Sequence, residues 1–202
     1  MKIFKNIFVS LFILLILTNS SWSKSASEFI SSLSTEASDI LSSKLSDEEK
    51  IIRLNKIGEQ SVDIKGVGLY TLGKYRKTLS DNQKKQYEEL FKDYFLKSFS
   101  GRLVGYSDAK IAVLSEEIKN EKYTIVYSKL IGTSERPEVK IDWRVYTKNP
   151  ENPLIRDIVI EGLSLARTQK EEFNSIIANN EGNIEALFEN LKTLQESIDK
   201  NK

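Results

Sequence analysis

The sequence predicts an α+β domain in which helices cover one face of a curved, four-stranded antiparallel sheet. Apolar residues recur with a helical period of about 3.6 over residues 27–103. Over residues 110–161 they alternate with the period of about 2 that is typical of strands. Short segments rich in charge, Gly, Pro and Asn separate the alternating stretches and resemble hairpin turns, which join antiparallel strands. Because helical patterns precede and follow the sheet, the class is α+β.

The first 23 residues have the pattern of a cleavable signal peptide. Two lysines precede an apolar run over 7–17. This run is too short to span a bilayer, which needs about 20 apolar residues. Small residues then lead to Ser23, after which we expect cleavage. The sequence thus predicts a signal peptide over 1–23 and one domain over 24–202, with a retained N-terminal anchor helix as the alternative.

The composition limits the chemistry of this domain. The chain has 30 Lys and Arg, 29 Asp and Glu, no Cys and no His. Its balanced charge gives no reason to expect a nucleic-acid partner. Without Cys there are no disulfides, thiolate metal sites, cysteine nucleophiles or lipoprotein anchors, and without His there is no serine-histidine triad. We therefore expect no enzyme, no metal site and no cofactor.

Helix-capping residues divide the start of the domain into two helices. Ser27 is placed to cap the first helix, whose apolar face extends to Leu41. Ser46 and Glu49 form the capping-box pattern that begins the second helix, and Gly58 is placed to end it. Two amphipathic helices are therefore expected ahead of residue 60.

Two more helices follow before the sheet. Asp63 is placed to cap a short helix that ends at Gly73, and Ser80 with Gln83 repeats the capping box at the start of the longest helix. The longest helix carries an apolar stripe rich in aromatic residues: Tyr87, Leu90, Phe91, Tyr94, Phe95, Phe99 and Leu103. Such a stripe is wide and deformable.

Four alternating segments predict the strands. They start at Ile111 and continue over 123–127, 141–146 and 157–161. Gly162 follows the last strand and is expected at a bend where the chain leaves the sheet, since glycine alone tolerates many such backbone angles. Two closing helices, with apolar residues over 173–177 and 184–194, complete the domain.

Asp157 and Glu161 share the face of the fourth strand opposite to Ile158 and Ile160. A carboxylate pair of this kind could serve as the acid-base group of an enzyme that works in a cavity. Their alternation with the two isoleucines points them away from the apolar face. We therefore expect a solvent-facing pair that bonds to Arg144 or to the backbone.

Two blocks of the sequence resemble a known family. The residues that carry the first block are Leu72, Gly73, Lys74, Tyr75, Ser80, Gln83, Phe91 and Phe95. The second block is the continuous segment 156–165, Arg-Asp-Ile-Val-Ile-Glu-Gly-Leu-Ser-Leu. They are similar to the Leu-Gly-x-Tyr motif with its later Gln and Phe, and to the Asp-Val-x-Val-Glu-Gly-Val-Ser segment, of the MlaC (toluene tolerance) family of periplasmic phospholipid-binding proteins. The resemblance covers nearly all of the domain.

Two positions depart from the family pattern. Arg76 stands where an aromatic residue usually follows the tyrosine, and Leu154 stands where a tryptophan usually opens the fourth strand. Either departure could reshape a pocket wall without changing the fold.

The resemblance implies a monomeric carrier in the periplasm that binds a diacyl phospholipid. Members of the family pass lipid between an outer-membrane complex with an MlaA-like lipoprotein and an inner-membrane ABC transporter with an MCE-domain subunit, and so maintain outer-membrane lipid asymmetry. The implied fold is similar to nuclear-transport-factor-2-like (NTF2-like) proteins, with an apolar cavity for acyl chains between sheet and helices. A carrier of another hydrophobic lipid, such as a hopanoid, and an enzyme with a polar cavity are the alternatives.

Apolar positions from the matching segments are the candidates for the cavity wall, with Leu163 and Ser164 at its mouth. The lipid-binding residues that we expect are Val67, Tyr70, Phe91, Phe95, Phe99, Ile141, Trp143, Val145, Ile158, Ile160, Leu163 and Ser164. Ordinary core packing is the alternative for each of them, because periodicity does not distinguish a core from a cavity. Ser164 could instead cap the helix that follows it.

Basic residues gather beside Tyr75. They are Lys74, Arg76, Lys77, Lys84 and Lys85. This cluster could dock an acidic partner surface or a lipid head group, or it could be the solvated edge of a helix.

Overall fold

The computed structural model describes residues 25–106, 109–133 and 136–200. Its helices are α1 (Ala26–Ser42), α2 (Asp47–Ser61), α3 (Ile64–Thr71), the short 3-10 helix η1 (Gly73–Lys77), α4 (Asp81–Leu103), α5 (Leu165–Asn179) and α6 (Ile184–Lys200). Its strands are β1 (Ile111–Asn120), β2 (Tyr123–Leu130), β3 (Val139–Tyr146), β4 (Leu154–Ile160) and β5 (Leu163–Ser164). The predicted signal peptide, 1–23, lies outside the described residues. Among the helices of the described part, none has both the length and the apolar character to cross a membrane.

The strands form one antiparallel sheet in chain order, β1-β2-β3-β4-β5. The predicted α+β class and the antiparallel sheet are confirmed. The short strand β5 is an addition to the four expected strands, because the chain turns back at Gly162 and pairs Ser164 with Val159. Gly162 has a φ of 83°, in the region that favours glycine, which explains the bend predicted there.

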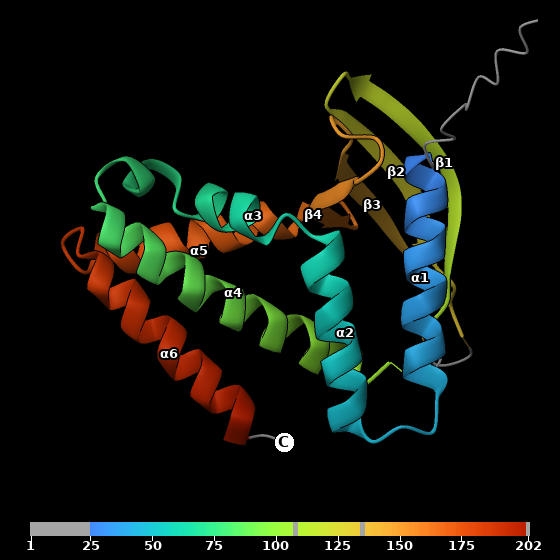
Figure 1. Cartoon of the computed structure of the whole chain (residues 1–202), viewed down its shortest axis with the longest axis horizontal. Helices are drawn as coiled ribbons and strands as arrows, with labels where there is room; N and C mark the ends of the chain where they lie inside the picture. The colour runs from blue at the N-terminus through green and yellow to red at the C-terminus, as the bar shows by residue number, and fades with distance from the viewer. Residues whose placement is uncertain (1–24, 107–108, 134–135, 201–202) are drawn as a thin grey trace, which may run out of the picture.

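Helix α1 lies along one face of the sheet, and the sheet curves around it (Figure 1). Ile30 of α1 is fully buried against Val126 of β2 and Val145 of β3. Val126 stands opposite Trp143 in the register, so the two side chains share this inner face. Burial of these apolar side chains joins α1 to the sheet in one core, which we call the sheet core.

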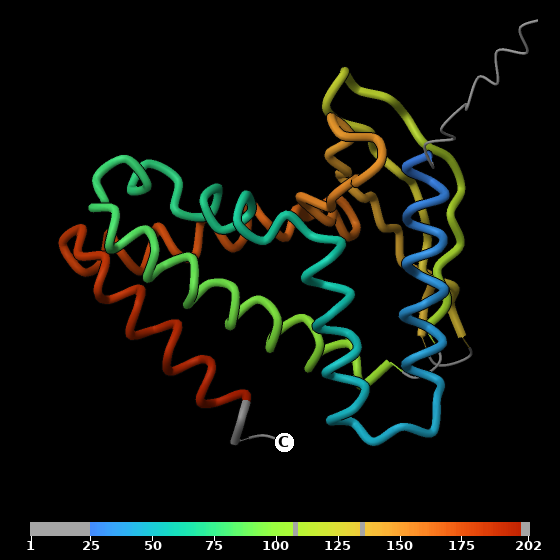
Figure 2. The backbone as a smooth tube through the Cα atoms, viewed as in Figure 1, coloured from blue at the N-terminus to red at the C-terminus, as the bar shows by residue number. Residues whose placement is uncertain are grey.

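The other helices build a second layer (Figures 1 and 2). Its core, which we call the helical core, contains the fully buried rings of Tyr87, Phe173 and Phe188. Phe91 meets Phe173 edge to face, with ring centroids 6.3 Å apart and planes at 89°. Such packing explains why the aromatic stripe of α4 folds as a continuous helix against α5 and α6.

Helix α2 connects the two layers. Figure 2 shows α1 and α2 side by side, joined by a short loop, with α2 next to the end of α4. Leu41 of α1 and Leu54 and Ile57 of α2 form a third buried cluster, which we call the hairpin cluster. Leu33 packs against this hairpin cluster and also against the sheet core, so the two are continuous.

Most of the predicted helix starts are confirmed. Both capping boxes, Ser46 with Glu49 and Ser80 with Gln83, are present. The Asp63 carboxylate accepts a 2.9 Å hydrogen bond from the backbone nitrogen of Gly66 at the start of α3. These caps depend on residues three positions apart, so the local sequence specifies them.

Two predicted helix boundaries are wrong. Ser25, not Ser27, caps α1, because Ser25 also has a glutamate three residues later and forms a capping box with Glu28. Helix α2 continues through Gly58 to Ser61. Gly58 does not end the helix but allows α2 to pack closely on α4, since a Cβ atom there would lie 3.2 Å from the side chain of Leu96.

The expected solvent-facing position of Asp157 is also wrong. A bulge opposite Arg144 and Val145 puts Ile155 and Ile158 on the inner face and leaves Asp157 on the outer face, as predicted. However, the start of α5 covers that face, and only 9% of Asp157 is exposed. The bonds predicted for it are present: an ion pair with Arg144 at 3.2 Å and a hydrogen bond from the backbone.

Candidate lipid-binding site

The predicted wall residues of the sheet lie together. Ile141, Trp143 and Val145 are buried in the sheet core, and Ile158 packs against them from β4. Ile160 is half-buried and stands opposite Ile141 in the register. The indole nitrogen of Trp143 donates a 2.9 Å hydrogen bond to the Ser128 hydroxyl, so its polar atom is satisfied on an otherwise apolar face.

The predicted wall residues of the helices form a second group. Phe91 is buried in the helical core, and Val67 and Phe95 pack against that core. Phe95 stacks on Phe91 at 6.2 Å and on Phe99 at 5.9 Å between ring centroids. The three phenylalanines follow one another along α4. Phe91 lies against Gly68 of α3, and Phe99 lies beside Gly58 of α2.

The remaining predicted residues lie at the surface or cap a helix. Tyr70 is 43% exposed and Leu163 is 60% exposed. Ser164 is buried and caps α5, because its hydroxyl accepts a 3.1 Å hydrogen bond from the backbone nitrogen of Arg167. The structure therefore divides the twelve candidates between the sheet core, the helical core and the surface, instead of placing them around one cavity.

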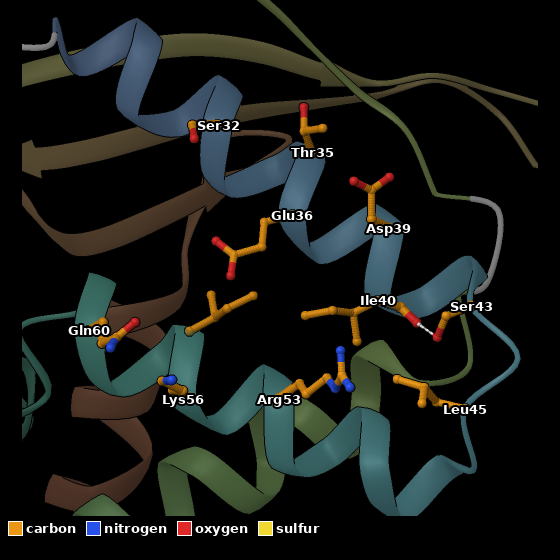
Figure 3. Close-up of a pocket in the computed structure, with 11 residues that line it drawn as sticks. Ser32, Thr35, Glu36, Asp39, Ile40, Ser43, Leu45, Arg53, Lys56 and Gln60 are labelled. Atoms are coloured by element: carbon orange, nitrogen blue, oxygen red, sulfur yellow. Dashed lines mark hydrogen bonds between the residues drawn. The ribbon is translucent and has the colours of Figure 1, made fainter.

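A groove of about 800 Å³ runs between α1 and α2 (Figure 3). Its apolar residues are Ile40, Leu45 and Ile57, of which Ile57 belongs to the hairpin cluster and Ile40 packs against it. The other lining residues are polar or charged: Ser32, Thr35, Glu36, Asp39, Ser43, Arg53, Lys56 and Gln60. The volume suits a small organic ligand or a lipid head group, but a lining with so many polar groups does not suit acyl chains alone.

A second groove, of about 960 Å³, lies where the end of α2 and the start of α3 meet α4 and the loop before β4. Two ion pairs cross it, Lys65 with Glu88 at 3.0 Å and Lys92 with Glu59 at 2.7 Å. Hydrogen bonding to Glu59 raises the pKa of Lys92 above its ordinary value. Leu154, one of the two departures from the family pattern, lines this groove.

Arg156 fixes the sheet to the helical layer next to this second groove. Its guanidinium donates hydrogen bonds to the Asp63 carboxylate at 2.6 Å and to the Tyr123 hydroxyl at 2.7 Å. It also lies 3.6 Å from the centroid of the Tyr146 ring. Because Asp63, Tyr123 and the Tyr146 ring all engage the guanidinium, we assign Arg156 a structural role.

The basic cluster beside Tyr75 is exposed. Lys74, Arg76 and Lys77 lie on η1, and the ammonium of Lys74 is 5.1 Å from the centroid of the Tyr75 ring. Lys170 of α5 joins this surface and lies 5.1 Å from the centroid of the Tyr70 ring. Lys84 instead pairs with Asp81 at 3.1 Å.

The groove residues of α1 and α2 were missed by the sequence analysis. In the sequence, Glu36 and Asp39 have the pattern of the solvated face of one helix, and Arg53 and Lys56 have that of the next helix. Their common place in a groove depends on how the two helices pack, which the period of each helix does not give. The sequence signal for this groove is that two consecutive helices carry pairs of opposite charge at the same spacing of three residues.

The family model for the MlaC protein matches residues 31–193 of this chain. That match includes both sequence blocks, the whole sheet, the helices from α2 to α5, and parts of α1 and α6. The chain belongs to the MlaC family. The resemblance inferred from residues 72–95 and 156–165 is thus confirmed.

A solved structure agrees with this MlaC assignment. The chain is similar to the phospholipid-binding protein from Ralstonia solanacearum, whose structure was determined in complex with a phospholipid. The TM-score is 0.72 at 18% sequence identity, and the match covers 87% of this chain and 99% of the other. At this identity the likeness establishes that this MlaC family member and the Ralstonia protein share a fold.

Proposed function

We propose that this protein is a periplasmic carrier that binds a diacyl phospholipid and passes it between an MlaA-like lipoprotein complex of the outer membrane and an inner-membrane ABC transporter with its MCE-domain subunit. Membership of the MlaC family is the observation that carries the proposal. The shared fold with a protein solved with bound phospholipid supports it. The signal peptide predicted over 1–23 agrees with a periplasmic location.

A carrier of this kind must hide acyl chains from water. Each buried methylene is worth about 0.8 kcal/mol, so two chains of about 15 carbons would cost on the order of 20 kcal/mol to expose. Transfer between a bilayer and the protein then becomes an exchange of one apolar surrounding for another. The direction of net transport would depend on partners that couple it to an energy source.

The residues that we propose for the acyl chains are the predicted wall residues of the sheet core and of α4. In the conformation described here the sheet residues pack against one another and against α1, with Val145 fully buried and Trp143 only 9% exposed. On α4, Phe91 is buried in the helical core and Phe95 packs against it. Binding would therefore require the layers to part and the lipid to replace contacts between them. Leu33 packs against both the sheet core and the hairpin cluster, so apolar side chains are continuous from the α1–α2 groove to the sheet.

The roles of the carboxylates favour a carrier over an enzyme. Both oxygens of Asp157 are engaged, by Ser164 and Arg144 on one side and by the backbone of Ala166 on the other. A general base needs a free oxygen that reaches a substrate. The neighbouring carboxylate, Asp142, is half-buried on the outer face of β3, away from the sheet core.

Mass spectrometry of an organic extract of the purified mature protein tests the proposed function. We expect diacyl phospholipid in near-stoichiometric amounts. A different extracted lipid, such as a hopanoid, would support the alternative carrier. A protein that is purified without lipid and takes none up from phospholipid vesicles would contradict the proposal.

A further inference from the structure

We propose that the groove between α1 and α2 binds the head group of a zwitterionic phospholipid, one that carries both an ammonium and a phosphate. This inference rests on the proposed function and extends it to the class of lipid carried. Phosphatidylethanolamine is the form that we use as the probe below.

The two walls of the groove carry opposite charges. Glu36 and Asp39 lie three residues apart on α1, and Arg53 and Lys56 lie three residues apart on α2. Figure 3 shows the Glu36 carboxylate and the Arg53 guanidinium extending into the space between the helices. The groove thus presents an acceptor for a cation on one side and donors for an anion on the other.

In the part of the chain that the structure describes, the charged groups of one wall do not form ion pairs with those of the other wall. Within residues 25–106, 109–133 and 136–200, no ion pair joins the α1 wall to the α2 wall. The second groove differs, since ion pairs already cross it. Opposite charges held apart around about 800 Å³ of space leave room for a ligand that has both charges.

The bottom of the groove leads toward apolar residues. Ile57 lines the groove and belongs to the hairpin cluster, and Ile40 lines the groove and packs against that cluster, which Leu33 connects to the sheet core. A head group held between the charged walls would therefore have its acyl chains directed at the residues proposed to bind them. This continuity favours a lipid over a free zwitterion of similar charge.

The charge pattern also predicts discrimination. Phosphatidylglycerol offers a phosphate to Arg53 and Lys56, but it has no cation for Glu36 and Asp39. Since exposed ion pairs are individually weak, we expect a preference for phosphatidylethanolamine of about threefold to tenfold.

The test is uptake from vesicles that contain equal amounts of phosphatidylethanolamine and phosphatidylglycerol, with the bound lipid extracted and measured by mass spectrometry. The unaltered protein should be enriched in phosphatidylethanolamine. The double variant Glu36→Gln/Asp39→Asn should load lipid in the ratio of the vesicles. Both side chains are exposed, so folding should be unaffected, which circular dichroism and thermal unfolding check.

The control variant is Glu171→Gln/Glu196→Gln, which removes the same charge from exposed positions of α5 and α6. It should keep the preference of the unaltered protein. The variant Arg53→Gln/Lys56→Gln should lower the load of both lipids, because both have a phosphate.

A second experiment detects the ammonium directly. A carbodiimide activates carboxylates, so an amine held next to Glu36 or Asp39 should form an amide with it, the oxygen leaving with the reagent as a urea. Phosphatidylethanolamine should be found on the peptide that contains these residues, whereas phosphatidylcholine, which has no N–H, should not couple.

Full loading with no head-group preference, or a preference that Glu36→Gln/Asp39→Asn leaves unchanged, would overturn the head-group site while leaving the proposed carrier function intact. A protein that takes up neither lipid would contradict the proposed function itself, and the head-group site with it.

Discussion

The hydroxyl of Ser164 donates a 2.6 Å hydrogen bond to the carboxylate of Asp157. The other oxygen of Asp157 accepts a 3.0 Å bond from the backbone nitrogen of Ala166, in the first turn of α5. Arg144 of β3 lies 3.2 Å from the same carboxylate. One buried side chain therefore joins two strands of the sheet to the start of a helix of the other layer.

Replacing Asp157 with Ala should destabilise the protein by about 2–4 kcal/mol, because it leaves a buried hydroxyl and a backbone N–H without their acceptor. Urea unfolding followed by circular dichroism measures the change. The control is Asp142→Ala, a half-buried carboxylate on the same face of the neighbouring strand. If both variants lose the same small free energy of unfolding, the joining role of Asp157 is wrong.

Asp157 also illustrates the limit of the sequence analysis. Its strand, its face and its bond to Arg144 were predicted correctly, because they depend on alternation within β4 and its neighbour. Its burial was not predicted, since it results from α5 folding back over that face. Caps such as Ser46 with Glu49 depend on two residues three positions apart and were predicted. The facing of Glu36 and Arg53 depends on how two helices pack and was not predicted.

Tyr87 should make the stability of the helical core sensitive to alkaline pH. Burial raises the pKa of its hydroxyl above the ordinary value of about 10. Because the folded state holds this proton more tightly than the unfolded state, the stabilisation is complete below pH 10 and is lost as the pH rises toward the folded pKa. One pH unit above 10 should remove about 1.4 kcal/mol.

Tyr87→Phe isolates this contribution. The variant loses the 2.8 Å hydrogen bond between the hydroxyls of Tyr87 and Thr71, so at pH 7 it should be less stable by about 0.5–1.5 kcal/mol. By pH 11 this difference should have vanished or changed sign. Urea unfolding at several pH values measures it, and a difference that stays constant from pH 7 to 11 would rule out the titration of Tyr87.

Gly68→Ala should destabilise the contact between α3 and α4. A Cβ atom at Gly68 would lie 2.7 Å from Cδ1 of the buried Phe91, so the ring must move, and we expect a loss of about 1–3 kcal/mol. Gly101→Ala is the matched control, because its nearest neighbour, Cγ2 of Ile198, would be 4.0 Å away. In that exposed helical position alanine should stabilise by about 0.5–1 kcal/mol. Thermal unfolding compares the two, and equal effects would refute the close packing at Gly68.

Filling the sheet core should exclude lipid. Ile158 is half-buried on the inner face opposite Trp143, where the proposed acyl chains would lie, so Ile158→Trp should lower the amount of phospholipid extracted per protein. Ile125→Trp makes the same change on the outer face, since Ile125 stands opposite Arg144, and it should leave the load unchanged. Both variants add a large ring at a half-buried position, and their unfolding free energies show whether each folds normally. Because the two differ chiefly in the face that they fill, equal loads in two folded variants would mean that the acyl chains do not contact the inner face of the sheet. The helical core around Phe91 and Phe95 would then be the remaining candidate for the acyl chains.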